Sequence, residues 1–313
     1  MSEAQSIIDT AFPNRHRAII STEELAHGVY NPSYLILLQD NSRYVLKVAP
    51  PPDVRVLHYE SFILEAEAST LRLIQERTTV PVPELIVYDE NCDILDSPYL
   101  LMTYPPGVTL DKLRPLLSSS DLDAIDHTVG HYLRQVGNVA SDRQCFGRGL
   151  SRAKMYVSWR ECFMALTEAV LRDGEDMLVI LPYEQLRQQF RQWAYTLDEV
   201  VQPRLSVLDF GDSSVLVDPE TRTVTGLIGF ERSGWFDPLL SVAFQRPSSA
   251  FIEGYGKDVL DTANKKCRSL LYSCYYSSVK IVGTYYQAGN VNEMEERKNL
   301  IRCLDALVSW MTE

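Results

Sequence analysis

The chain has 313 residues, of which 45% are hydrophobic and 23% are charged, and its formal net charge is −12. A chain of this length can bury a sizeable core as one two-lobed unit or as two small domains. The acidic balance argues against nucleic-acid binding, which needs a basic face, and no segment is long and apolar enough to span a membrane. The N-terminus lacks a signal-peptide pattern, so we expect a cytoplasmic protein.

Six cysteines are scattered along the chain without a C-x-x-C pair. This spacing indicates neither a zinc site nor a disulfide framework, and reduced thiols are the expected state. The cysteines are Cys92, Cys145, Cys162, Cys267, Cys274 and Cys303.

Short apolar runs separated by polar turns predict an antiparallel sheet in the first hundred residues. The first runs are Ile19–Thr22, a segment from Leu25 to Leu38 that turns at Gly28, and Tyr44–Val48 after a turn at Asp40–Arg43. A single glycine at the start of a strand is usually only a turn, although it can also cradle a phosphate.

Lys47 lies within the last of these strands, on the face opposite to Leu46 and Val48, because successive side chains of a strand alternate. A lysine on a strand is usually solvated, but here the next element is a helix that can supply a counterion. This helix is predicted from Tyr59 to Glu76 because apolar residues recur at helical spacing. These apolar residues are Leu64, Ala68, Leu71 and Ile74.

Two further strands, Glu84–Val87 and Tyr99–Met102, lead into the proline-containing segment Thr103–Gly107. Such a segment is typical of a stiffened linker between domains. We therefore expect a lobe boundary here, with residues 1–104 forming a small lobe and residues 105–313 a larger, mainly helical lobe.

The helical part contains two patterns that could bind a ligand. A helix predicted from Leu122 to Gly137 carries His127 and His131 on one face at a spacing that suits a metal, but no third ligand lies nearby, so we expect an ordinary core helix instead of a metal site. Acidic residues near the next helix could line a pocket for a cation, although acidic helix ends are usually solvated. These residues are Glu161, Asp173, Glu175 and Asp176.

Carboxylates flank a predicted β-hairpin between Ser206 and Leu240. Its strands are Val215–Val217 and Val224–Ile228, and the polar turn Asp218–Arg222 separates them. Folding of the hairpin brings its two flanks to the same end, so the flanking carboxylates could form a site. Asp209 and Asp212 precede the hairpin, and Glu231 and Asp237 follow it.

This segment resembles the catalytic segment of the aminoglycoside phosphotransferase and choline kinase-like family, and most of all its fungal branch. The resemblance extends over nearly all of the chain, from about Ile19 to Trp310. It implies an α+β, two-lobed protein-kinase-like fold with a small antiparallel-sheet N-lobe and a mainly helical C-lobe. The residues that carry it are Asp209-Phe-Gly-Asp-Ser-Ser214, Val217-Asp-Pro219, Gly226-Leu-Ile-Gly-Phe-Glu-Arg232 and Trp235-Phe-Asp-Pro-Leu239.

The resemblance also implies roles for individual residues. It places Asp209 at the position of the catalytic base, and it matches Lys47 and Glu67 to the ion pair that orients the nucleotide phosphates. The remaining nucleotide-binding positions are Gly28 and Asn31 in the phosphate loop, and Met102 and Tyr104 at the hinge where adenine docks. The residues expected near the substrate are Asp212, Glu231, Trp235 and Asp237.

The sequence departs from the family at two metal-binding positions. The family's magnesium-binding asparagine falls on Ser214, and the aspartate that bridges the metal ions to the phosphates falls on Gly229. A serine hydroxyl is a poorer ligand for a hard cation than an amide oxygen, and glycine offers no side-chain oxygen. Loss of a direct ligand should lower the rate on the order of a thousandfold or more, unless Asp212 or Glu231 takes its place.

Asp209-Phe210-Gly211 also spells the metal-binding tripeptide of protein kinases. That interpretation would make Asp209 a magnesium ligand, and it requires a catalytic loop and a hairpin upstream. The upstream segment Tyr195–Pro203 offers neither. The hairpin lies downstream of Asp209 instead, as the resemblance to the aminoglycoside phosphotransferase and choline kinase-like family requires.

We therefore expect a phosphotransferase-like protein with a degenerate magnesium site. It would be a small-molecule-binding protein or an acid–base catalyst of a biosynthetic pathway, without ATP or magnesium as cofactors. Two alternatives stay open: an active ATP- and magnesium-dependent small-molecule phosphotransferase, and a non-catalytic pseudokinase-type scaffold. A serine hydrolase function is not expected, because Ser213 or Ser214 would need a nearby base to act as nucleophile and no histidine follows His131 in the sequence. The expected partner is a small molecule, not nucleic acid or a membrane, and the sequence does not define the oligomeric state.

Overall fold

The computed structural model shows two compact units, which are described separately. The described residues of unit 1 come from 1–54, 62–122 and 212–232, and those of unit 2 from 55–61, 123–211 and 233–313. Each unit groups the residues that contact one another most densely, and each consists of several chain segments. The lobe boundary after residue 104 therefore stays a prediction. The residues described are 2–13, 17–25, 31–50, 54, 56–58, 62–141, 143–148, 154–257, 260–286 and 291–309.

Unit 1 is built on a five-stranded sheet with the order β1-β2-β3-β5-β4, in which every neighbouring pair is antiparallel. At the turn between β2 and β3, the Asp40 carboxylate accepts a hydrogen bond of 3.0 Å from the Ser42 amide. The predicted antiparallel sheet is thus confirmed. The strands are β1 (Ile19–Glu24), β2 (Ser33–Leu38), β3 (Arg43–Val48), β4 (Leu85–Asp89) and β5 (Tyr99–Thr103).

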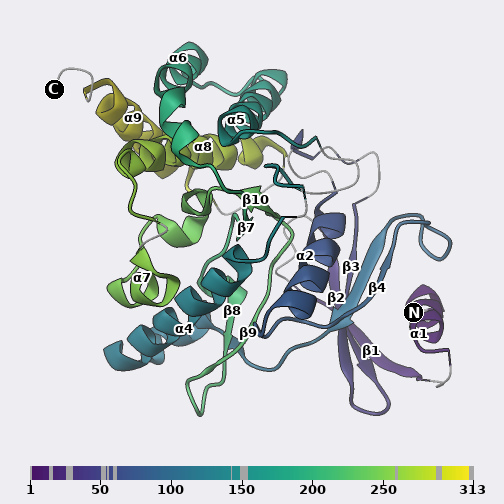
Figure 1. Ribbon diagram of the computed structural model, residues 1–313. Coiled ribbons are helices and arrows are strands. Elements are labelled where there is room, and N and C mark those ends of the chain that lie inside the picture. Colours follow the sequence, from purple (N-terminus) through teal and green to yellow (C-terminus); the bar gives the residue numbers. More distant parts are fainter. Residues whose placement is uncertain are drawn as a thin grey trace. The chain divides into compact units, whose positions relative to one another are not determined.

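Helices α1 (Ser2–Ala11) and α2 (Ile63–Arg77) lie on opposite sides of this sheet (Figure 1). Alternation along β3 directs Tyr44 and Leu46 into a core shared with α1, and Lys47 to the face of α2. The apolar residues predicted for α2 are all buried. Phe62 has a left-handed backbone with φ of 63°, so the helix begins at Ile63, and the predicted start at Tyr59 lies outside the described residues.

The predicted hairpin is also present in unit 1, as β8 (Val215–Val217) and β9 (Val224–Leu227). Its turn is held by Asp218, whose carboxylate accepts hydrogen bonds from the amides of Glu220 and Thr221 at 2.7 and 2.9 Å. A third strand, β6, pairs with β8. The short elements beside the hairpin are β6 (Val108–Thr109), α3 (Leu110–Leu113) and the 3₁₀ helices Arg114–Leu116 and Asp212–Ser214.

Helix α4 spans Ser119–Gly137 and begins earlier than the predicted start at Leu122. Ser118 explains the difference, because its hydroxyl accepts a hydrogen bond from the Asp121 amide at 3.2 Å and donates one to the Asp121 carboxylate at 2.6 Å. This reciprocal arrangement satisfies a free amide at the helix start and stabilises the first turn.

Unit 2 is mainly helical. Its helices α5, α6, α8 and α9 gather into a bundle (Figure 1), and its two strands, β7 and β10, form an antiparallel pair. On α8 the residues Leu271, Cys274, Tyr275, Val279 and Val282 form a buried apolar stripe, and Leu270 beside them is partly exposed. The helices are α5 (Trp159–Asp176), α6 (Tyr183–Trp193), α7 (Ser249–Tyr255), α8 (Lys265–Tyr286) and α9 (Glu293–Ser309), and the strands are β7 (Arg204–Val207) and β10 (Ser233–Phe236).

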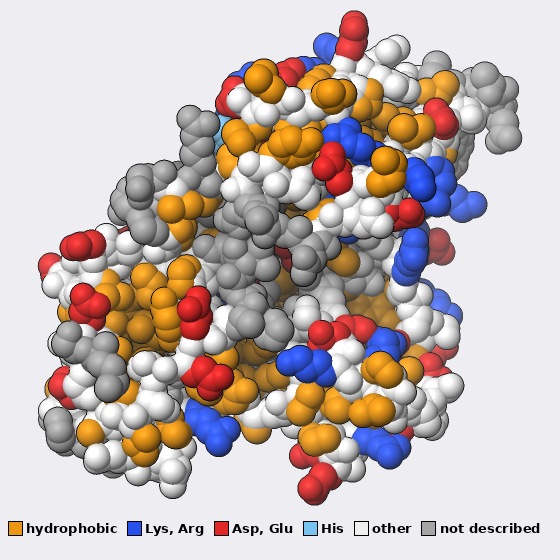
Figure 2. All heavy atoms as spheres, turned by 180° about the vertical axis from the view of Figure 1, so that it is seen from behind, with side chains coloured by type: hydrophobic (Ala, Val, Ile, Leu, Met, Phe, Trp, Pro, Cys, Tyr) orange, Lys and Arg blue, Asp and Glu red, His pale blue; other side chains and the backbone are white. Residues whose placement is uncertain are grey.

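Among the described residues of unit 2, short 3₁₀ helices also lie at Ala194–Glu199, Pro238–Leu240 and Val242–Phe244. On the face shown in Figure 2, basic and acidic side chains of the described residues are interspersed among hydrophobic ones. Within the described part of the chain, no helix is both long and apolar enough to cross a membrane.

Candidate functional site

A cluster of one lysine and two glutamates lies in unit 1. The Lys47 ammonium contacts both carboxylate oxygens of Glu67 at 2.8 Å, and it also forms an ion pair with Glu231. Lys47 and Glu67 are 8% and 1% exposed, whereas the Glu231 side chain is 29% exposed. The predicted pairing of Lys47 with Glu67 is confirmed, and Glu231 joins it from the end of the hairpin.

Burial and charge perturb all three groups. Burial, reinforced by the Glu231 charge, raises the pKa of Glu67 to about 7, although Lys47 opposes the shift. Burial also acts to raise the pKa of Glu231, but the Lys47 ammonium outweighs it and holds this pKa below the usual range. The two carboxylates raise the pKa of Lys47 despite its burial, so the lysine stays charged.

Ser214 and Gly229, the two altered metal positions, lie next to each other in unit 1. The Ile228 amide donates a hydrogen bond of 2.9 Å to the Ser214 carbonyl. Gly229 has a left-handed backbone with φ of 82°, and a Cβ placed there would lie 3.3 Å from Ser214 Oγ and 3.7 Å from a carboxylate oxygen of Glu231. The hairpin therefore brings these positions together at one end, as predicted.

Asp212, expected near the substrate, is paired with an arginine in the same unit. Both guanidinium nitrogens Nε and Nη2 of Arg114 donate to its carboxylate, the latter at 2.9 Å. Such a two-point contact fixes the carboxylate geometry. Sequence reasoning missed Arg114, which carried no signal beyond its charge.

Asp209 is solvent-exposed in unit 2, between the buried residues Leu208 and Phe210. The Leu208 carbonyl accepts two hydrogen bonds, from the Tyr276 hydroxyl at 2.9 Å and from the Val242 amide at 2.8 Å. The backbone beside Asp209 is thus held on two sides, while its carboxylate faces solvent.

Trp235 and Asp237, the other residues expected near the substrate, are buried in unit 2. Asp237 is 3% exposed and accepts hydrogen bonds from Arg268 Nε at 3.0 Å and from the Tyr272 hydroxyl at 2.6 Å. Arg268 is itself 2% exposed and also contacts Glu199 at 2.6 Å. In this structure Asp237 therefore belongs to a buried ion-pair network.

The predicted nucleotide-binding residues are only partly described. Gly28 lies outside the described residues. Asn31 is buried, and its side-chain oxygen accepts no hydrogen bond from the described part of the chain. Met102 is buried on β5 opposite Val45, and the Tyr104 amide donates to the Arg43 carbonyl at 3.1 Å. The role of these residues in nucleotide binding stays a prediction.

The helical part contains the two other patterns that could bind a ligand, the histidine pair and the acidic residues. The described residues contain no group of three or more His, Cys, Asp or Glu side chains that could hold a metal, so His127 and His131 gain no third ligand among them. Two of the four acidic residues are engaged within unit 2: Asp173 is buried and binds the ring and the amide of His58, and Glu175 binds Arg187.

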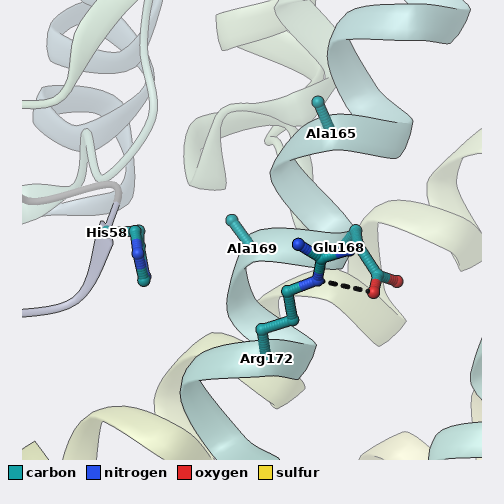
Figure 3. Close-up of a pocket in the computed structure, with 5 residues that line it drawn as sticks. All are labelled: His58, Ala165, Glu168, Ala169 and Arg172. Carbon is teal, nitrogen blue, oxygen red and sulfur yellow. Dashed lines mark hydrogen bonds and ion pairs between the residues drawn. The ribbon is translucent and has the colours of Figure 1, made fainter.

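Beside that contact, unit 2 has a cavity of about 260 Å³. In Figure 3 the His58 ring lies across from α5, where Arg172 is hydrogen-bonded to Glu168 at 3.1 Å. The lining residues are His58, Ala165, Glu168, Ala169 and Arg172. The sequence did not indicate this cavity, because the chain around His58 is distant from α5 in sequence.

Solved structures share this fold. A candidate fructosamine-3-kinase of Thermobifida fusca aligns with a TM-score of 0.70 at 16% identity, over 97% of this chain and 99% of that chain. A thermostable mutant of aminoglycoside phosphotransferase APH(4)-Ia, in a ternary complex with AMP-PNP and hygromycin B, aligns with a TM-score of 0.64 at 16% identity, over 97% and 98% of the chains. The two-lobed, kinase-like α+β fold expected from the sequence is thereby confirmed.

A curated mouse protein, acyl-CoA dehydrogenase family member 10, is 26% identical over 227 residues, which are 70% of this chain. The chain spans about a fifth (19%) of the length of that relative. The family model described as "Phosphotransferase enzyme family" matches residues 21–251, which is more than two thirds of the chain. This chain therefore belongs to the phosphotransferase enzyme family.

Proposed function

We propose that this member of the phosphotransferase family binds a small organic molecule and does not transfer phosphate from ATP efficiently. The observation that carries the proposal is the pair Ser214 and Gly229. By resemblance, these positions hold an amide and a carboxylate that bind magnesium in active relatives, and here they offer one hydroxyl and no side chain at all.

The oxygen atoms around this pair do not fit a magnesium ion. Magnesium requires a near-octahedral set of oxygen ligands, usually with carboxylates among them. Glu231 is the nearest carboxylate to Gly229, but it is paired with Lys47, and Asp212 is paired with Arg114. Recruiting either carboxylate to a metal would break an existing ion pair.

The state of Lys47 supports the same conclusion. A lysine that orients phosphates must offer its ammonium to them, yet the Lys47 ammonium is held by Glu231 in addition to its usual partner Glu67. One cation facing two carboxyl groups creates no positive field for a triphosphate. A neutral or cationic organic molecule would meet no such repulsion.

Asp209 is the residue proposed to act on the bound molecule, as general acid or base. Asp209 is solvent-exposed and the backbone beside it is held through Leu208, so the residue is accessible to a small molecule. Proton transfer by a carboxylate requires neither ATP nor a metal ion. We propose that this proton transfer serves small-molecule biosynthesis, which is also the role expected from the sequence.

Calorimetric titration with AMP-PNP, with and without magnesium, tests the loss of phosphotransfer. We expect no magnesium-dependent binding tighter than about 1 mM, because the metal positions lack ligands. Magnesium-dependent binding in the micromolar range would contradict the proposal. It would favour an active phosphotransferase, the alternative that the intact Lys47–Glu67 pair supports.

A chromosomal Asp209→Asn substitution tests the catalytic role and does not require the substrate to be identified. We expect the metabolite profile of this strain to match that of a deletion strain, because asparagine cannot exchange the proton. Asp305→Asn, at an exposed position on α9, is the matched control and should leave the profile unchanged. If Asp209→Asn also leaves it unchanged while the deletion alters it, the protein acts as a binder or scaffold.

A further inference from the structure

Two cysteines face each other across the packed helices α8 and α9. Polar contacts fix the alignment of the two helices, which run antiparallel: each step forward along α8 is matched by a step backward along α9. These contacts join Lys280 to Glu296 at 2.8 Å and Ser277 to Asn299 at 2.8 Å. One turn further, the same alignment places Cys274 opposite Cys303.

The two thiols are both shielded from solvent. Cys274 is fully buried and Cys303 is 6% exposed. Cys303 Sγ lies 3.9 Å from the side-chain oxygen of Asn299, whose amide nitrogen donates to Ser277 on α8. Small side chains at Ser273 and Ser277 on α8 allow the helices to approach closely, which a disulfide requires.

We propose that Cys274 and Cys303 form a dithiol that closes to a disulfide between α8 and α9 on reaction with a peroxide. The alignment of the helices and the burial of both cysteines carry this proposal, and it is independent of the function proposed above. Both cysteines are in the reduced, free form in this structure.

Cys303 is the attacking residue. The neighbouring Cys274 thiol, helped by Arg302, lowers the pKa of Cys303 to about 7 in spite of burial, whereas the same interaction raises the pKa of Cys274. The Cys303 thiolate attacks one peroxide oxygen and breaks the O–O bond, which gives a sulfenic acid and water after protonation. The Cys274 sulfur then displaces the sulfenic hydroxyl as a second water, so two thiols and one hydrogen peroxide give one disulfide and two waters.

The other buried cysteines are suitable controls. Burial raises the pKa of Cys162 and of Cys267, the latter to about 11, so their thiolates are scarce at neutral pH. Cys267 is the closer match, because it lies on α8 together with Cys274.

The test treats the full chain with hydrogen peroxide, followed by non-reducing digestion and mass spectrometry. We expect a linked peptide pair containing Cys274 and Cys303, an intact mass reduced by two hydrogen atoms, and reversal by dithiothreitol. Because a cross-link restricts the unfolded chain, the melting temperature should rise by several degrees after oxidation. This rise should persist in Cys267→Ser and be absent in Cys303→Ser.

The wild-type peptide map decides the matter even if Cys303→Ser does not fold. Oxidation of the partly exposed Cys92 or Cys145 without any link between Cys274 and Cys303 would overturn the proposal. Addition of two or three oxygen atoms to Cys303 in place of a link would also overturn it, since that shows Cys274 to be out of reach.

Discussion

Replacing Arg268 with methionine should lower the free energy of unfolding by about 3–5 kcal/mol. Arg268 and Asp237 are both almost fully buried, and the guanidinium also bonds to Glu199 and to the Thr262 hydroxyl. Methionine fills a similar volume but leaves the Asp237 carboxylate without its cation in a region without water contact. Urea unfolding followed by circular dichroism measures the loss.

An exposed arginine gives the matched control. Arg172 forms an i,i+4 pair with Glu168 on α5, and its side chain is 69% exposed, so Arg172→Met should cost only about 0.3–0.5 kcal/mol. A loss below about 1 kcal/mol for Arg268→Met would show that Asp237 is satisfied by Tyr272 alone.

The double substitution Ser214→Asn and Gly229→Asp should create magnesium-dependent affinity for AMP-PNP, with a gain of tenfold or more, about 1.4 kcal/mol. The two positions are adjacent in unit 1, so both restored side chains would reach one ion. Aspartate tolerates the left-handed backbone at Gly229 better than most residues. Ser214 Oγ, 3.3 Å from the new Cβ, belongs to the side chain that is itself replaced.

Gly229→Ala controls for the backbone, because it adds the strain of a Cβ at φ of 82° without adding an oxygen ligand. Calorimetric titration with magnesium compares the variants, and thermal melting verifies that each is folded. No gain in the double variant would reject simple loss of metal ligands. The remaining explanation would be a nucleotide pocket remodelled elsewhere, at the loop of Gly28 or at the hinge around Tyr104.

Local sequence patterns predicted those parts of the fold that depend on residues close together in the sequence. Alternation along β3 indicated that Lys47 faces the following helix, the family resemblance implied that its partner is Glu67, and the structure has this contact. The start of α4 could also have been predicted, because Ser118 and Asp121 have the spacing of a helix cap. The hairpin was predicted because turn and strand residues are contiguous.

Pairings between distant elements could not be predicted in the same way. Glu231 lies 184 residues from Lys47, and nothing in its own neighbourhood indicates that it would join the pair. Arg268 is an arginine near the start of a helix, where solvent exposure is the usual outcome, yet it is buried against Asp237. Such contacts depend on how elements pack, which periodicity does not encode.

The support around Asp209 has a consequence for how this protein can evolve. Buried residues on either side and two hydrogen bonds to the Leu208 carbonyl hold the backbone at this position. Substitutions at this position can therefore exchange the reacting group while its placement is inherited unchanged. Natural selection can therefore change the reactive side chain at this position while the surrounding fold stays the same.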